Sequence, residues 1–216
     1  MSRRNIIFVF LVLFGMSVLF AYFQSLPSLL QKKPTLLTGK ILTRPMELDN
    51  FELIDQNNQT FNSESLKGNW TILFFGYTNC PDVCPTTIYK LAEVKNDVNQ
   101  NLPSKNFNTV LVTLDPDRDT PERLDEYIGY FDESMLGVTG TYKNIQSFSS
   151  NLSVFYQRIN KDGGYDFNHT ASIFVFNQDG SLFATMSPAT SVSELRDDFY
   201  TCLLYTSDAA DEEDSV

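Results

Sequence analysis

The chain has 216 residues, enough for one domain with a short appendage. A hydrophobic share of 42% and 18 phenylalanines support a substantial core. The formal net charge of -11 argues against nucleic acid as a partner, because binding phosphates requires a basic surface. His169 is the one histidine, so any site that needs an imidazole must use it.

The N-terminus has the pattern of a membrane anchor. Arg3 and Arg4 precede an apolar stretch, residues 6–23. As a helix this stretch would span about 27 Å, close to the hydrocarbon thickness of a bilayer. Positive charge before the stretch places the N-terminus in the cytoplasm. We therefore predict an uncleaved transmembrane helix within residues 1–23, with a cleaved signal peptide as the alternative.

Proline-rich chain follows the anchor. Residues 24–45 contain Pro27, Pro34 and Pro45 and are expected to form a linker. The folded domain is expected to cover residues 46–201. Periodicity and turn residues predict its elements in this order: strands 51–54 and 59–61, a helical turn 63–67, strand 72–75, a helix ending near 102, strand 107–114, a helix from 121, helix 142–152, strands 154–159, 172–176 and 182–186, and a helix from 193.

This order gives the fold class. Two strand–helix units are followed by a β-hairpin and a final helix, which is the order of the thioredoxin arrangement. We expect an α/β, thioredoxin-like domain in which helices flank a mixed central sheet.

Two cysteines follow the buried strand, and each has a proline directly after it. Cys80 and Cys84 lie where a loop after Gly76 is expected to become a helix. Thiols four residues apart on a helical turn lie about 5–6 Å apart at Cβ, so they can form a disulfide or bind one soft metal ion. A structural disulfide is the simpler alternative, but this sheet edge is where open α/β folds carry their sites.

Residues 202–216 have an unusual composition for the end of a domain. The run from Cys202 to Glu212 can be back-translated into a transposase-type sequencing adapter read in frame. We therefore predict that residues 202–216 are a non-native tail and that Cys202 is not a native thiol. An ordinary acidic tail is the alternative.

Three blocks closely resemble the SCO/SenC family, over roughly residues 46–200. They read F-F-G-Y-T-N-C-P-D-V-C-P-T, V-T-L-D-P-D-R-D-T-P-E-R-L and D-F-N-H-T-A-S-I-F-V-F. The family consists of membrane-anchored, thioredoxin-like copper proteins that assist assembly of cytochrome c oxidase. One departure is Asn168, which stands where an acidic residue is expected before the histidine.

The resemblance implies that Cys80, Cys84 and His169 are copper ligands. Two thiolates and an imidazole suit Cu(I) in a three-coordinate site, and they can hold Cu(II) with an added ligand. Zinc fits less well, because a closed zinc site needs four ligands. Around the ligands we expect Asp82 to tune the thiols or contact a partner, with a solvated loop residue as the alternative. We expect the remaining charged and aromatic residues to brace the loop or pack beneath the motif: Asp115, Asp117, Arg118, Asp119, Phe75 and Tyr77.

Two functions compete for this site. The first is a metallochaperone that passes copper to the dinuclear copper centre of a cytochrome c oxidase subunit, after receiving it from a periplasmic copper donor. The second is a thiol–disulfide oxidoreductase that reduces the cysteines of that subunit. Both use Cys80 and Cys84 as a redox-active pair, but only the first needs His169. By the topology above, the site would lie on the periplasmic side of a bacterial-type inner membrane.

Overall fold

The computed structural model describes residues 12–22, 34–105 and 107–213, with side chains described as far as residue 205. The chain divides into two compact units, Met1–Pro34 and Thr35–Val216. Residues 12–22 of the first unit are helical, and the rest of the predicted anchor lies outside the described residues. Among the helices described, none is both long enough and apolar enough to cross a membrane.

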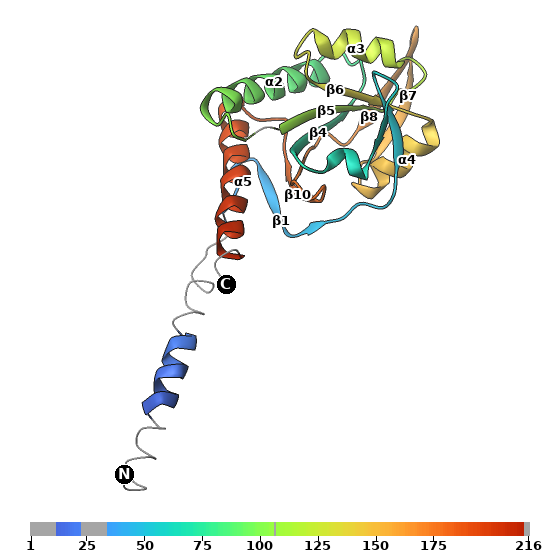
Figure 1. Ribbon diagram of the computed structural model, residues 1–216. Helices are drawn as coiled ribbons and strands as arrows, with labels where there is room; N and C mark the ends of the chain where they lie inside the picture. Colours follow the sequence, from blue (N-terminus) through green and yellow to red (C-terminus); the bar gives the residue numbers. More distant parts are fainter. Residues whose placement is uncertain (1–11, 23–33, 106, 214–216) are drawn as a thin grey trace, which may run out of the picture. The chain divides into compact units, whose positions relative to one another are not determined.

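An eight-stranded mixed sheet forms the centre of the second unit (Figure 1). The parallel strands β4, β5 and β6 lie inside it, and the other pairs are antiparallel. This architecture confirms the predicted α/β, thioredoxin-like class. Across the sheet the order is β1 (Gly39–Met46), β10 (Leu182–Met186), β9 (Ile173–Phe176), β4 (Trp70–Gly76), β5 (Phe107–Thr113), β6 (Leu136–Thr139), β2 (Glu52–Asp55) and β3 (Thr60–Asn62).

Helices cover both faces of this sheet. On one face, Ile72 and Phe74 of β4 pack in a cluster with residues of α2 (Val83–Asn101), α3 (Pro121–Gly129) and α5 (Val192–Glu213). On the other, Leu73 and Phe75 pack with α4 (Tyr142–Asn151) and the short helix η1 (Ser63–Leu66). Each fully buried side chain of this size contributes about 1.5–3 kcal/mol. Burial on both faces explains why β4 is a continuous apolar run.

A separate two-stranded hairpin carries the histidine. Its strands, β7 (Tyr156–Lys161) and β8 (Gly164–His169), pair only with each other. The pairing runs from Tyr156 opposite His169 to Lys161 opposite Gly164. Gly163 in the turn has φ +85°, a conformation that favours glycine. The position of His169 therefore depends on how this hairpin is attached to the rest of the domain.

Part of the expected linker is a strand. Residues 39–45 belong to β1, which pairs with β10 at the edge of the sheet. Most side chains of β1 are not buried, and its register shifts between Ile41 and Met46. Pro45 lies in this irregular stretch, where an edge strand tolerates a residue without an N–H. Because of these features, the periodicity of apolar residues did not predict strand β1.

The final helix runs through the segment predicted to be non-native. In α5, Cys202 and Leu203 are fully buried beside Phe199. The first residues of the segment thus complete the packing of α5 against the sheet. Its origin stays a prediction.

Candidate metal centre

The two motif cysteines lie at the edge where β4 and β5 end. These strands are parallel, with Gly76 opposite Thr113, so the loops that follow them meet at the same edge. α2 begins at Val83, which leaves Cys80 in the loop and Cys84 in the first helical turn. The predicted placement of the thiols where the loop becomes a helix is confirmed, but Cys80 lies before the first helical turn rather than within it. Pro81 explains the difference, because proline disfavours the helical conformation in the residue before it.

The two thiols are in contact and have opposite protonation preferences. The backbone N–H of Cys84 donates to Sγ of Cys80 at 3.4 Å. The thiol of Cys84 also donates to Cys80 and, with the backbone N–H groups of Asp82 and Cys84 and the hydroxyl of Tyr77, lowers the pKa of Cys80 to about 5. The pKa of Cys84 is raised well above its usual range by that same hydrogen bond and by burial. The pair is therefore a thiolate and a thiol that share one proton.

Close packing fixes Cys84 from below. A Cβ atom placed on Gly76 would lie 3.1 Å from Sγ of Cys84 and 3.2 Å from Cε1 of Phe74. Phe74, rather than Phe75, is thus the aromatic residue beneath the motif. Phe75 points to the opposite face, where it contacts Phe148 with ring centroids 5.6 Å apart. Alternation along the strand places neighbouring side chains on opposite faces.

His169 is at the end of β8 and is half-buried. Its ring makes edge contacts with Phe74 at 6.4 Å and with Tyr77 at 6.2 Å between centroids. Its Nδ1 atom lies 3.1 Å from the carbonyl oxygen of Thr170. When Nδ1 carries the proton and donates to that carbonyl, Nε2 presents a lone pair to a metal ion.

The structure brings two of the three predicted ligands together. Cys80 and Cys84 are in contact with each other. His169 lies at the same edge of the sheet, where its ring contacts Phe74 and Tyr77. Across the described ranges, no three His, Cys, Asp or Glu side chains converge closely enough to hold a metal ion. The donor set itself fits copper, since soft thiolates and an imidazole are the ligands that Cu(I) takes.

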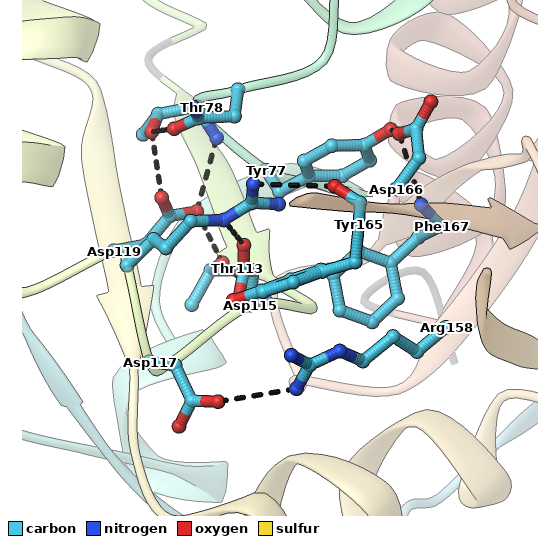
Figure 2. A network of polar contacts seen from close by, with 12 residues as sticks. Tyr77, Thr78, Thr113, Asp115, Asp117, Asp119, Arg158, Tyr165, Asp166 and Phe167 are labelled. Atoms are coloured by element: carbon cyan, nitrogen blue, oxygen red, sulfur yellow. Dashed lines mark hydrogen bonds and ion pairs between the residues drawn. The ribbon is translucent and has the colours of Figure 1, made fainter. Parts of the chain in front are cut away.

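A buried carboxylate joins the two loops of the site (Figure 2). Asp119 is fully buried and accepts hydrogen bonds from the backbone N–H of Thr78 at 3.0 Å and the hydroxyl of Thr78 at 2.6 Å. The hydroxyl of Thr113 donates to it at 2.5 Å. Burial raises the pKa of Asp119. This carboxylate braces the loop after β4, as the sequence suggested for its block.

A second group of polar contacts joins the loop after β5 to the hairpin. Tyr165 donates from its hydroxyl to the buried Asp115 at 2.8 Å, and Asp115 also pairs with Arg118. Arg158 of β7 pairs with Asp117 at 3.5 Å. Figure 2 shows Tyr165 between Asp115 and Arg158, with Asp117 beside the guanidinium group of Arg158. Sequence reasoning missed Tyr165 and Arg158, because nothing local connects Tyr165 to Asp115, 50 positions away, or Arg158 to Asp117.

The remaining predicted residue, Asp82, makes no side-chain bond to the start of α2. It occupies the N-cap position and is exposed. Its backbone N–H, rather than its carboxylate, is what acts on Cys80.

Known proteins resemble this chain over most of the domain. A family model described as SCO1/SenC matches residues 42–203. An SCO2-like protein of Rickettsia conorii is 35% identical over 155 residues, which cover 68% of this chain and 75% of the relative. The structure of Bradyrhizobium japonicum ScoI with copper bound is 33% identical, with a TM-score of 0.62, over 70% of this chain and 96% of that one. Arabidopsis thaliana ScoI with copper bound is 27% identical, with a TM-score of 0.69, over 74% and 98%.

Proposed function

The chain belongs to the SCO1/SenC family, and on that premise we propose that it is a copper-binding metallochaperone for the dinuclear copper centre of cytochrome c oxidase. The observation that carries the proposal is the contact between the thiolate of Cys80 and the thiol of Cys84 at the carboxyl end of β4. Two similar solved structures hold copper. We assign Cys80, Cys84 and His169 as the ligands.

The protonation states suggest how the cargo would enter and leave. Cys80 is half-buried and already ionised near neutral pH, so it is the first sulfur that incoming Cu(I) meets. Cys84 is buried and protonated, so it must release its proton to become the second ligand. Loading reduced protein at neutral pH should therefore release close to one proton for each copper ion. Protonation of Cys84 would weaken the site during transfer.

Partners and location belong to the same proposal. The acceptor would be the copper-accepting subunit of the oxidase, and the donor a periplasmic copper carrier. Arg3, Arg4 and the apolar residues 6–23 support anchoring in a bacterial-type inner membrane with the domain on the periplasmic side. Thiol–disulfide exchange by Cys80 and Cys84 is compatible with that oxidising compartment.

The same asymmetry favours a second function, thiol–disulfide exchange. The thiolate of Cys80 would attack a partner disulfide and form a mixed disulfide, releasing one partner thiolate. Cys84, after losing its proton, would attack Sγ of Cys80 and release the second partner thiolate. The two electrons come from this chain, which ends with a Cys80–Cys84 disulfide. An external dithiol must then reduce that disulfide before the next cycle.

Copper titration of the full chain tests the first function. Reduced protein should bind one Cu(I), whereas the disulfide form should bind it poorly, because a disulfide has no thiolate to donate. Cys80→Ser and Cys84→Ser should each lose copper, and the buried Cys202→Ser is the control that should retain it. Equal Cu(I) uptake by reduced and oxidised protein would refute the site.

His169→Ala separates the two functions. The two thiols remain, so disulfide exchange should continue at a near-normal rate. Copper should be held more weakly, with Cu(II) losing most because it favours nitrogen ligands. The readout is oxidase activity in a strain that lacks the native protein, complemented at matched protein level. Wild-type activity under copper limitation would favour the reductase over the chaperone.

A further inference from the structure

The hairpin that carries His169 is attached to the domain by side chains rather than by a sheet. β7 and β8 form their own two-stranded sheet and share no ladder with the eight-stranded one. β9 begins at Ile173, four residues after His169, so the chain itself holds that end of the hairpin, and the side-chain contacts with the loops after β4 and β5 set how the rest of it lies. Three of the described contacts with the loop after β5 converge on one residue, Tyr165, and a fourth contact reaches it from within the hairpin.

Tyr165 lies between two guanidinium groups. The Cζ atom of Arg118 is 3.9 Å from the centroid of its ring, and that of Arg158 is 3.4 Å away. Both distances are within the range of a cation–π contact. Arg118 belongs to the loop after β5 and also donates from Nη1 to the carbonyl oxygen of Tyr165 at 3.3 Å. Figure 2 shows Arg158 beneath the ring, reaching toward Asp117.

The ring of Tyr165 is also fixed at its far end. Its hydroxyl donates to Oδ1 of Asp115 at 2.8 Å, and Asp115 is fully buried. Asp115 in turn pairs with Arg118, so the same carboxylate holds the hydroxyl and one of the two guanidinium groups. A ring held on both faces and at its hydroxyl has little freedom to move.

Tyr165 and His169 lie on the same face of β8. Side chains alternate along a strand, so residues 165, 167 and 169 share a face. Phe167 between them is buried and contacts Tyr77 at 5.3 Å, which identifies this face as the one turned toward the domain. Across the hairpin Arg158 pairs with Phe167, and Tyr156 pairs with His169. Tyr165, which is clamped by Arg118, Arg158 and Asp115, and the imidazole of His169 thus lie on the same face of the hairpin.

The geometry makes the clamp decisive for a metal ligand. Tyr165 and His169 are four positions apart along the strand, a distance of about 13 Å. A tilt of about 10° at Tyr165 would move His169 by about 2 Å, whereas ligand distances are held to about 0.2 Å. A site with a histidine on such a hairpin needs the hairpin fixed at a second point.

We propose that Tyr165, clamped between Arg118 and Arg158, is the positioning residue that holds His169 at the sheet edge of the Cys80–Cys84 pair. The inference rests on the proposed function, since it concerns the third ligand of the same copper site. The proposal gives Asp115 and Arg118, from the second of the three family blocks, a role in positioning the imidazole ligand. Thiol chemistry should not depend on the clamp, because Cys80 and Cys84 belong to the loop after β4 and the first turn of α2, outside the hairpin.

The test compares two replacements of Tyr165 in the full chain. Tyr165→Leu removes the ring and the hydroxyl, whereas Tyr165→Phe keeps a ring between the guanidinium groups. Reduced protein receives one equivalent of Cu(II) without oxygen, and electron paramagnetic resonance reports nitrogen coupling from the imidazole. The midpoint potential of the Cys80–Cys84 pair is measured in parallel in glutathione buffers.

Tyr165→Leu should lose the nitrogen coupling and bind Cu(II) about 10–100-fold more weakly, as is typical when a group that orients a ligand is removed. Its dithiol potential should stay at the wild-type value. Tyr165→Phe should retain the nitrogen coupling. Wild-type nitrogen coupling in Tyr165→Leu would overturn the inference, and so would a potential that shifts together with the loss of coupling.

A matched pair of surface variants keeps the test decisive if Tyr165→Leu does not fold. Arg158→Gln removes one side of the clamp, and Arg123→Gln removes an arginine of equal side-chain exposure, 46%, that pairs with Glu126 on α3. The first should weaken nitrogen coupling and the second should not. Unchanged coupling in Arg158→Gln would then overturn the inference. If the wild-type chain takes up no copper, the proposed function fails and the inference fails with it.

Discussion

The backbone N–H of Cys84 points to the Sγ atom of Cys80 across 3.4 Å, at the start of α2. N–H groups at a helix start carry partial positive charge, which stabilises an anion placed there. Together with the thiol of Cys84 they lower the pKa of Cys80 to about 5, while Cys84 stays protonated. Cys80 is also less buried than Cys84, so the sulfur that is ionised is the one that solvent and ligands can reach.

Replacing Cys84 with alanine should raise the pKa of Cys80. The thiol of Cys84 is the largest of the groups that lower it, so its loss should move the pKa from about 5 toward the ordinary 9, with the backbone donors keeping it below that value. The measurement is the rate of iodoacetamide alkylation against pH, whose midpoint should move upward. Cys202 is the internal control, because burial raises its pKa to about 12 and it should not react in folded protein. Superimposable profiles for wild type and variant would contradict this account.

Gly76→Ala should destabilise the site end of β4. The added methyl would lie 3.1 Å from Sγ of Cys84 and 3.2 Å from Cδ1 of Leu111. Overpacking of this kind costs about 1–3 kcal/mol of unfolding free energy. Gly129→Ala is the matched control, because no atom lies within 4 Å of its Cβ position and alanine favours the helix by about 1 kcal/mol. Urea unfolding should give opposite signs for the two, and equal effects would show that Gly76 is not tightly packed.

Asp119 should be replaceable by asparagine but not by alanine. Asparagine retains an acceptor for the N–H of Thr78, and the hydroxyl of Thr78 can turn to accept from the amide. Alanine leaves buried donors without a partner, at a cost of about 1–3 kcal/mol. Urea unfolding at neutral pH should rank wild type and Asp119→Asn together, above Asp119→Ala. Equal loss in both variants would show that the carboxylate charge itself is required.

The same carboxylate gives a pH dependence. Burial raises the pKa of Asp119 above its ordinary 3.8, so folded protein holds this proton more tightly than unfolded protein. The contribution of Asp119 to stability should therefore fall as pH rises from 3.8 to the folded pKa, and be constant above it. Asp119→Asn cannot titrate and should lack that decline. The difference between the two unfolding curves against pH isolates the contribution from other acids.

The sequence predicted the parts of this fold that depend on local patterns. The apolar run of β4 and the Thr120–Pro121 start of α3 were placed correctly, because burial on both faces and capping leave signals in adjacent residues. The dithiol was placed at the correct sheet edge for the same reason. Strand β8 was missed, since its residues Gly164–His169 alternate weakly and pair only within a hairpin.

What local patterns could not give is the way distant segments meet. The hydrogen bond from Tyr165 to Asp115 spans 50 residues, and no sequence feature near either residue predicts it. The prediction that Phe75 packs beneath the thiols, where the structure has Phe74, was wrong for a different reason. Both faces of β4 are buried, so the apolar run carries no alternation that would tell which aromatic faces the thiols.

Asp198 supplies a final test, of where the folded unit begins. It is 2% exposed in α5 and accepts from the backbone N–H groups of Leu37 at 2.6 Å and Thr38 at 2.7 Å, ahead of β1. Asp198→Ala leaves both N–H groups without this acceptor, at a cost of about 1–3 kcal/mol. It should also open the chain around residues 35–38 to protease, detected by mass spectrometry of the fragments.

The neighbouring Asp197 provides the control for Asp198. Its side chain is 54% exposed and pairs with Arg196 at the surface, so Asp197→Ala should change stability by less than about 1 kcal/mol and leave the cleavage pattern as in wild type. Cleavage near residues 35–38 at equal rates in wild type and both variants would mean that this segment is not held by α5. Protection in wild type and Asp197→Ala, lost only in Asp198→Ala, would place the start of the folded unit near Thr35. In that case the tether available to the domain is shorter than the 24–45 linker inferred from prolines, because its last residues are bound to α5 and β10.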